Sequence, residues 1–159
     1  MLTFDNELQA VRDASGFTEE QLLILESEFE TAYDESQTML NNIDALWEFQ
    51  DELRSLSKRN SFRDALVRMG ERKFVILLSG INETQAQVDK CVAEETERYF
   101  ESLDTLESIV HECVKNGVLH KNAPWELSNG RMFPSASRIM KHRNDLKNII
   151  IARKEQNNG

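Results

Sequence analysis

The sequence predicts an all-α fold, an elongated antiparallel bundle of about four main helices with coiled-coil-like seams. Its 159 residues contain only six Gly and two Pro, which are too few chain breakers for the many turns of an all-β domain. Apolar residues recur at heptad spacing, and capping-box motifs precede the periodic stretches. We therefore expect a single helical domain over 1–159, large enough to bury a core.

The first long helix is expected over 18–58. The stretch "FTEEQL" is a capping box, in which the Thr18 hydroxyl accepts a hydrogen bond from the Gln21 backbone and the Gln21 side chain reaches back. A heptad of apolar residues follows over about five repeats, as in an extended helical hairpin or coiled coil. Ser36 and Gln50 interrupt this seam, which consists of Leu22, Leu25, Phe29, Ala32, Met39, Ile43, Leu46 and Leu53.

A second helix is expected over 61–80, with Ser61 of "SFRD" as its cap. The run "FVILLSGI" at 74–81 is apolar on every side of a helix, so we expect it to be buried on several sides. A short buried strand is the alternative interpretation of this run. Self-association as a homodimer is the function we predict for three of its residues, Phe74, Ile76 and Leu77.

A third helix is expected over 82–116, with Asn82 of "INETQ" as its cap. Its apolar stripe consists of Val88, Val92, Tyr99, Leu103, Leu106, Val110 and Cys113. The pair Asn116-Gly117 should end this helix, because Gly117 can adopt the left-handed conformation and bring Val118 onto Cys113.

Residues 117–134 are predicted to form a packed connector with one helical turn around Pro124–Glu126. The segment is too apolar for a free linker, since it carries Val118, Leu119, Trp125, Leu127, Met132 and Phe133. A basic C-terminal helix should follow over 135–154. The side chains expected to face inward from it are Ile139, Met140, Leu146, Ile149 and Ile150.

The net charge is −9, which opposes nonspecific binding of the whole molecule to nucleic acid or to an anionic membrane. The charge nevertheless alternates in four blocks: residues 1–53 are acidic, 54–73 basic, 74–114 acidic and 115–159 basic. An acidic helix that returns as a basic one aligns opposite charges along a hairpin. Exposed ion pairs contribute only about 0–1 kcal/mol each, so we expect them to select neighbours rather than to supply stability.

Two charged faces are candidate partner-binding sites. The first is the C-terminal helix with a nearby aromatic residue: Arg138, Lys141, Arg143, Lys147 and Trp125. The alternative is that this basic face packs against the chain's own acidic helices. The second face lies on the first helix and consists of Glu26, Glu30 and Asp34, which could imitate the phosphates of a nucleic acid.

The pattern offers little for an enzyme. Glu94, Glu97, Glu101 and Asp104 have i,i+3 spacings that could hold a metal ion, but they are more typical of a solvated acidic face. No base or nucleophile can be paired with His142 near Arg138. We therefore expect no catalytic residue, no metal and no cofactor. Cys91 and Cys113 are far apart and outside any CxxC pair, which is typical of reduced thiols in a cytoplasmic protein. No membrane span or secretory signal is visible, and we expect no membrane partner.

The sequence thus predicts a non-enzymatic protein–protein interaction module, such as an adaptor, inhibitor or assembly factor, that presents charged helix faces to another protein. One alternative is an acidic nucleic-acid mimic that inhibits a nucleic-acid-binding protein. The other is nucleic-acid binding through the basic C-terminal helix, which is possible but not favoured.

Overall fold

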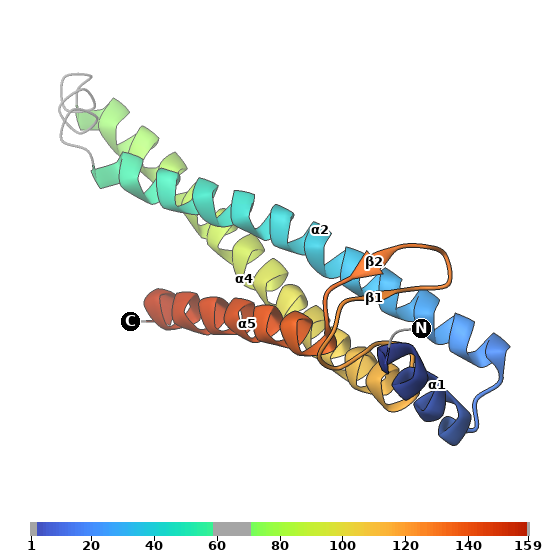
Figure 1. Cartoon of the computed structure of the whole chain (residues 1–159). Coiled ribbons are helices and arrows are strands. Elements are labelled where there is room, and N and C mark those ends of the chain that lie inside the picture. Colours follow the sequence, from blue (N-terminus) through green and yellow to red (C-terminus); the bar gives the residue numbers. More distant parts are fainter. Residues whose placement is uncertain (1–2, 59–70, 159) are drawn as a thin grey trace. The chain divides into compact units, whose positions relative to one another are not determined.

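The computed structural model describes residues 3–58 and 71–158, and these residues form helices apart from turns and one short hairpin (Figure 1). The predicted all-α bundle is confirmed. The elements, in chain order, are α1 (Thr3–Ser15), α2 (Glu19–Lys58), α4 (Glu71–Lys115), β1 (Trp125–Glu126), β2 (Met132–Phe133) and α5 (Ala136–Asn158). The first ten positions of the predicted helix 61–80 lie outside the described residues, as do the side chains of Phe74, Ile76 and Leu77.

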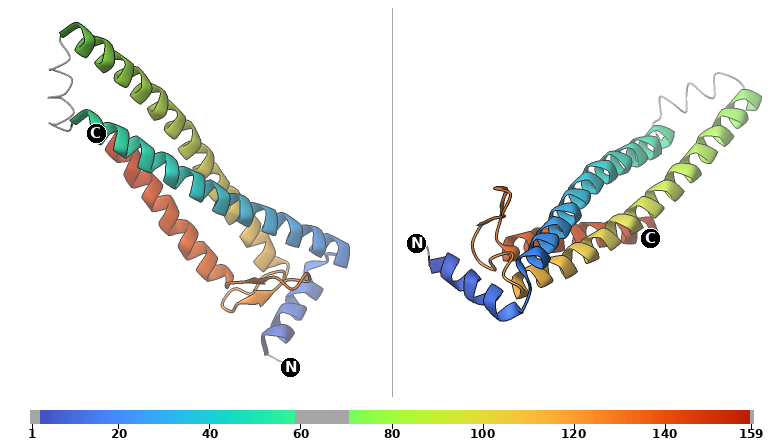
Figure 2. Two further views of the ribbon diagram at one scale, coloured as in Figure 1. Left: turned by 90° about the horizontal axis from the view of Figure 1, so that it is seen from above. Right: turned by 90° about the vertical axis from the view of Figure 1, so that its right-hand side faces the viewer.

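The chain divides into two compact units. Unit 1 comprises Met1–Gln37 and Phe100–Gly159, and unit 2 comprises Thr38–Tyr99. Helices α2 and α4 each contribute one part to each unit. Figure 2 shows these two helices from two further sides. Whether the chain is a single domain, as the sequence predicts, stays a prediction.

Helix α2 begins as the sequence predicts. The Gln21 N–H donates to Thr18 Oγ1 at 3.1 Å, and the Thr18 N–H donates to Gln21 Oε1 at 2.8 Å, so the capping box is complete. The heptad seam is confirmed at its centre, where four of its residues are buried: Leu25, Phe29, Ala32 and Ile43. The two polar interruptions are buried too, and both are satisfied. Ser36 donates to the Tyr33 carbonyl, and Gln50 donates to Asp89.

The expected break between a second and a third helix near Asn82 is wrong. Helix α4 runs without interruption through Gly80 and Asn82. A single Gly costs a helix about 1 kcal/mol relative to Ala, which lowers its stability without ending it. The Thr84 hydroxyl donates to the Gly80 carbonyl at 2.9 Å, a bond typical of a residue inside a helix. The apolar stripe of α4 is confirmed, because its members from Val92 to Cys113 are buried.

Helix α4 ends at Lys115, directly before the predicted Asn116-Gly117 pair, and Gly117 has a φ of 76°. The Val118 N–H donates to the Cys113 carbonyl at 2.7 Å, and the Gly117 N–H donates to the Val114 carbonyl at 3.3 Å. These two bonds define a Schellman motif, and its apolar contact is present because Val118 and Cys113 are both fully buried. The prediction for this helix end is confirmed.

Helix α1 docks on this helix end. Arg12 Nε donates to the Gly117 carbonyl at 2.6 Å. The buried His120 accepts the backbone N–H groups of Asn122 and Ala123 at Nδ1, both at 3.0 Å. The imidazole proton must therefore lie on Nε2, which is 3.1 Å from a carboxylate oxygen of Glu7. His120 thus links α1 to the turn that follows α4.

The helical turn expected around Pro124 is wrong, because this segment forms a β-hairpin. Trp125 pairs with Phe133 and Glu126 pairs with Met132. The turn between them, Ser128-Asn129-Gly130, has the composition of a hairpin loop, and Gly130 takes a φ of 86°. The connector packs on the helices as predicted, since four of its apolar side chains are buried: Val118, Leu119, Leu127 and Phe133.

Helix α5 begins at the predicted place, where Ser135 Oγ accepts the Arg138 N–H at 3.2 Å. It ends at Asn158, beyond the expected Lys154. Ile139 and Ile150 are buried, but the inward orientation predicted for Ile149 is wrong, because this side chain is 52% exposed. Consecutive residues of a helix point about 100° apart, so the narrow buried stripe includes Ile150 but not Ile149.

We expect Gly117→Ala to destabilise the protein more than Gly16→Ala does. Both glycines have a φ of 76°, so both substitutions incur the left-handed strain of about 1–2 kcal/mol. Only at Gly117 would the added methyl lie 2.9 Å from the backbone of α1, at Arg12 N and Leu8 O, whereas Gly16 has open space. Urea denaturation followed by circular dichroism measures both values. Equal losses would show that α1 does not press on this turn.

We also expect the two thiols to differ sharply in reactivity. Cys91 is exposed, whereas Cys113 is buried. Burial, together with the charges of Glu26, Glu28 and Glu112, raises the pKa of Cys113 to about 12. Because the thiolate is the nucleophile, one thiol should react quickly with Ellman's reagent at pH 8 and the second only after unfolding. Cys91→Ser should abolish the fast phase, and a fast phase that persists in this variant would contradict the burial of Cys113.

Candidate functional site

Part of the basic face of α5 is turned toward α4. Arg143 is only 4% exposed. Its Nε donates to the Leu103 carbonyl at 2.9 Å, and its Nη2 lies 2.8 Å from carboxylate oxygens of both Asp104 and Glu107. Lys147 Nζ lies 2.9 Å from Asp104. The hydrogen bond from Lys147 and the charges of both cations hold the pKa of Asp104 below its usual value. Arg143 is therefore an internal residue whose guanidinium is held by α4, and its role in partner binding stays a prediction.

Two lysines in the C-terminal part of α5 also contact α4. Lys147 and Lys154 place their ammonium groups 4.7 and 4.5 Å from the centre of the Phe100 ring, within the range of cation–π attraction. The alternative weighed for the basic face, packing against the chain's own acidic helix, thus describes this part of α5.

Arg138 and Lys141, which together we call the cationic edge, behave differently. Both side chains are exposed, and neither forms an ion pair with any of the residues that the structure describes. They are three positions apart and therefore neighbours on the helix surface. Of the four basic residues predicted to bind a partner, these two remain accessible for it.

The three predicted acidic residues of α2 hold the hairpin in place. Glu26 accepts the backbone N–H and the hydroxyl of Ser128, at 3.3 and 3.0 Å. Glu30 accepts the amide of Asn129. Asp34 pairs with both Nη atoms of Arg131, at 2.7 and 2.9 Å, and the hydrogen bonds from Arg131 lower the pKa of Asp34. These three carboxylates, spaced four residues apart, we call the acidic ladder.

Trp125 is partly buried and packs against the core of unit 1. That core includes an aromatic cluster in which the Phe133 ring lies 4.9 Å from Phe29 and 5.1 Å from Tyr33, both edge to face. The guanidinium of Arg131 lies 4.6 Å from the centre of the Phe133 ring. Trp125 is thus a core residue of the hairpin rather than an exposed platform for a nucleic-acid base.

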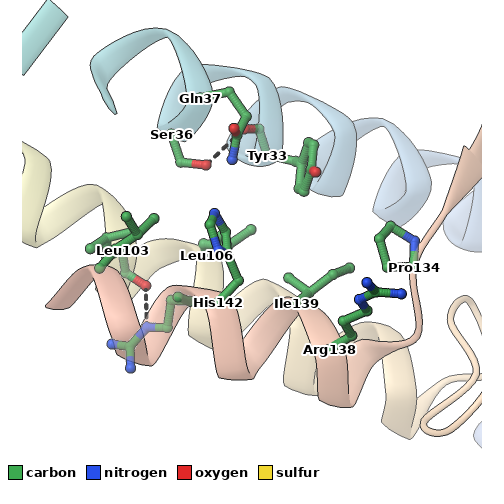
Figure 3. Close-up of a pocket in the computed structure, with 11 residues that line it drawn as sticks. Tyr33, Ser36, Gln37, Leu103, Leu106, Pro134, Arg138, Ile139 and His142 are labelled. Carbon is green, nitrogen blue, oxygen red and sulfur yellow. Dashed lines mark hydrogen bonds between the residues drawn. The ribbon is translucent and has the colours of Figure 1, made fainter. Parts of the chain in front are cut away.

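A cavity of about 160 Å³ opens beside the cationic edge. Helices α2, α4 and α5 form its walls, and all of its residues belong to unit 1 (Figure 3). Its apolar lining consists of Leu103, Leu106, Pro134, Ile139 and Leu146. Its polar lining consists of Tyr33, Ser36, Gln37, Arg138, His142 and Arg143.

The polar residues of the cavity are not equally available. Ser36 donates to the Tyr33 carbonyl at 2.7 Å, and Arg143 is engaged with Leu103. Figure 3 shows Arg138 and His142 extending from α5 toward α2, with Leu106 and Ile139 between the helices. The cavity therefore combines an apolar interior with a basic edge that has no ion pair among the described residues.

Arg138 and Arg143 were among the residues predicted to bind a partner, whereas the other cavity residues were not. Tyr33, Gln37 and Leu106 come from helices that are far apart in the sequence, and only the packed structure brings them together. One local signal for the cavity was present in the sequence. Arg138, His142 and Leu146 follow at four-residue intervals, so they lie on one helix face, and Ile139 lies beside it.

We expect Arg143→Ala to lower the free energy of unfolding by about 1–3 kcal/mol, the typical cost of deleting a buried hydrogen-bonding partner. Lys141→Ala, two positions earlier on the same helix, should change it by less than about 0.5 kcal/mol, as is usual for an exposed position without partners. Urea denaturation measures both. Similar effects of the two substitutions would contradict the division of the α5 cations into internal and exposed groups.

Other sites receive no support from the described part of the chain. Within it, no three His, Cys, Asp or Glu side chains are grouped so as to hold a metal ion, and Asp104 of the candidate metal face is paired with Arg143 and Lys147. No helix among these residues has the length and apolar character needed to cross a bilayer. Comparison with family models, curated proteins and solved structures finds no match to this chain.

Proposed function

We propose that this chain is a non-enzymatic protein–protein interaction module whose unit 1 binds an acidic segment of a partner protein. One large apolar side chain of the partner enters the cavity between α2, α4 and α5, and neighbouring carboxylates meet Arg138 and Lys141. The observation that carries the proposal is the apolar cavity bordered by cations that have no ion pair within the described residues.

The size of the cavity favours a side chain over a cofactor. Pockets for drug-sized ligands have volumes of about 300–1,000 Å³. A dry cavity of about 150 Å³ lined by Leu, Ile and Phe is known to take up benzene. At about 160 Å³, the present cavity matches one aromatic ring or one large aliphatic side chain. Insertion of such an anchor into a pocket is the usual centre of binding energy at a protein interface.

The charge of the edge favours an acidic partner. Exposed ion pairs contribute about 1 kcal/mol or less each, so the cationic edge adds less affinity than the apolar anchor. Its main effects are faster association and the orientation of the bound segment. His142, which lines the cavity between the cationic edge and Leu146, can donate a further hydrogen bond to a carboxylate.

The alternative functions have less support. A nucleic-acid mimic would need the acidic ladder to be free, whereas its three carboxylates bind Ser128, Asn129 and Arg131. Binding of nucleic acid through α5 would need several cations to neutralise phosphates, but three of the lysine and arginine residues of α5 face the chain's own Asp104 or Phe100. Catalysis would need a paired nucleophile and base, and Ser36 donates to a carbonyl instead. Two free thiols are in keeping with the cytoplasmic location that we propose.

We expect a fluorescein-labelled peptide of about twelve residues, with one Phe flanked by Glu, to bind the protein in an anisotropy titration. Arg138→Glu should weaken binding about tenfold, a change of about 1.4 kcal/mol. Gln37→Trp should do the same, because its indole would fill the cavity from the rim. The matched control is Lys90→Glu, an exposed charge reversal on α4 in unit 2, which should leave binding unchanged.

Two further peptides complete this test. Replacing Phe with Ala removes the anchor and should abolish binding, whereas replacing Glu with Lys reverses the charge and should weaken binding. Equal affinity of all three peptides, or equal effects of Arg138→Glu and Lys90→Glu, would disprove docking at this cavity.

A further inference from the structure

We propose that the partner segment belongs to a second copy of this chain. Phe49 of one copy enters the cavity of another, and Glu48 and Glu52 meet Arg138 and Lys141 there. This inference rests on the proposed function and identifies its partner. It assigns self-association to residues other than Phe74, Ile76 and Leu77, for which the sequence alone predicted that role.

The cavity sets the requirements for its occupant: a ring-sized apolar side chain that is exposed in the free protein and has carboxylates nearby. Phe49 is 51% exposed on α2. Glu52 follows at i+3 and is therefore a neighbour of the ring on the helix surface, and Glu48 lies one turn before Glu52 on the same side of α2. Both glutamates are exposed, and neither forms an ion pair with another described residue.

The other exposed large apolar residues fit these requirements less well. Ile149 and Ile151 lie on the same basic helix as the cavity's cations, and Met132 follows Arg131. Leu23 borders the hairpin loop beside the acidic ladder. Phe17 is less exposed than Phe49 and lies in the turn before α2. Val11 and Ile24 are aliphatic. Among the side chains that the structure describes, Phe49 is therefore the exposed aromatic ring that lies on a helix face with acids nearby.

The charges of the two proposed surfaces are complementary. We call the side of α2 that carries Phe49 the guest, and the cavity with its cationic edge the host. Asp44, Glu48 and Glu52 follow at four-residue intervals and line one shallow depression of unit 2, so their negative charges lie on one side of α2. The host offers Arg138 and Lys141. Two chains with a net charge of −9 repel each other at a distance, so a contact between copies has to place opposite charges next to each other. The exposed cationic edge and this acidic side of α2 do so.

The cavity can take up the phenyl ring of Phe49. A ring of this size can bind in a cavity of about 150 Å³, and the cavity of unit 1 measures about 160 Å³. Its apolar lining from α4 and α5 would replace the water that now covers half of the Phe49 side chain, which is the favourable transfer that drives most protein association.

The decisive test uses two variants of the full chain that lose opposite halves of the contact. Arg138→Glu damages the host and keeps the guest, whereas Phe49→Ala removes the guest and keeps the host. Both positions are exposed, and circular dichroism verifies that the variants fold. In sedimentation velocity over a concentration series, the wild type and the control Lys90→Glu should self-associate, and each of the two variants alone should weaken association at least about tenfold.

Mixing the two variants should restore mixed complexes, because Arg138→Glu chains supply Phe49 and Phe49→Ala chains supply an intact cavity. Only one contact per pair can form, so the mixture should associate more weakly than the wild type and more strongly than either variant alone. A mixture that stays monomeric would overturn the inference, as would variants that associate like the wild type.

The outcomes separate this inference from the proposed function. If the wild type is monomeric but the Phe-Glu peptide binds and Arg138→Glu weakens it, the docking function stands and the second-copy partner is wrong. If the peptide fails to bind and association instead disappears in Leu77→Glu, both proposals are wrong, and the copies meet through residues 74–77.

Discussion

The arrangement of unit 1 depends on one buried cation. Removing a guanidinium from water is costly unless it is fully hydrogen-bonded, and Arg143 is satisfied on three sides by the Leu103 carbonyl, Asp104 and Glu107. Hydrogen bonds are directional, whereas the apolar contacts of Ile139 and Ile150 would tolerate rotation or sliding of the helix. Arg143 thereby fixes the rotation of α5 against α4, and this rotation turns Arg138 and His142 toward α2. Because both carboxylates remain partly exposed to solvent, their desolvation cost is modest, so the pairing stabilises as well as orients.

The opposite wall of the cavity depends on the acidic ladder. By holding Ser128, Asn129 and Arg131, the ladder keeps the hairpin against α2 and seats Phe133 between Phe29 and Tyr33. Tyr33 belongs both to this aromatic cluster and to the cavity lining, so the hairpin supports the site without touching its occupant. Most of the charged residues first suspected of partner binding thus have an architectural role, and the binding role that we propose falls to the few that this architecture leaves exposed.

The accuracy of the sequence analysis follows the range of the interactions involved. The capping box at Thr18, the Schellman motif at Gly117 and the seam of α2 depend on neighbours within one or two turns, and all three were predicted. The break expected at Asn82 is absent. A capping-box sequence is compatible with the start of a helix but does not force one, and the residues on both sides of Asn82 continue α4. The hairpin, the burial of Arg143 and the cavity depend on residues far apart in the sequence. Heptad spacing predicted that α2 and α4 have apolar stripes, but not which carbonyl an arginine of α5 would reach.

The alternation of charge along the sequence now has a partial physical explanation. The basic block 115–159 supplies partners to two acidic blocks, through Arg131 to Asp34 and through Arg143 and Lys147 to Asp104, and Arg54 of the block 54–73 pairs with Asp89. Among the charges that these pairings leave over in the described residues are Arg138 and Lys141 on α5 and Asp44, Glu48 and Glu52 on α2. Surplus charges of one sign would serve solubility. Surplus charges of both signs, one set beside an apolar cavity and the other beside an exposed phenyl ring, are what the interface that we propose requires. The same physics that pairs charges within the units therefore favours a contact between molecules at the charges left over.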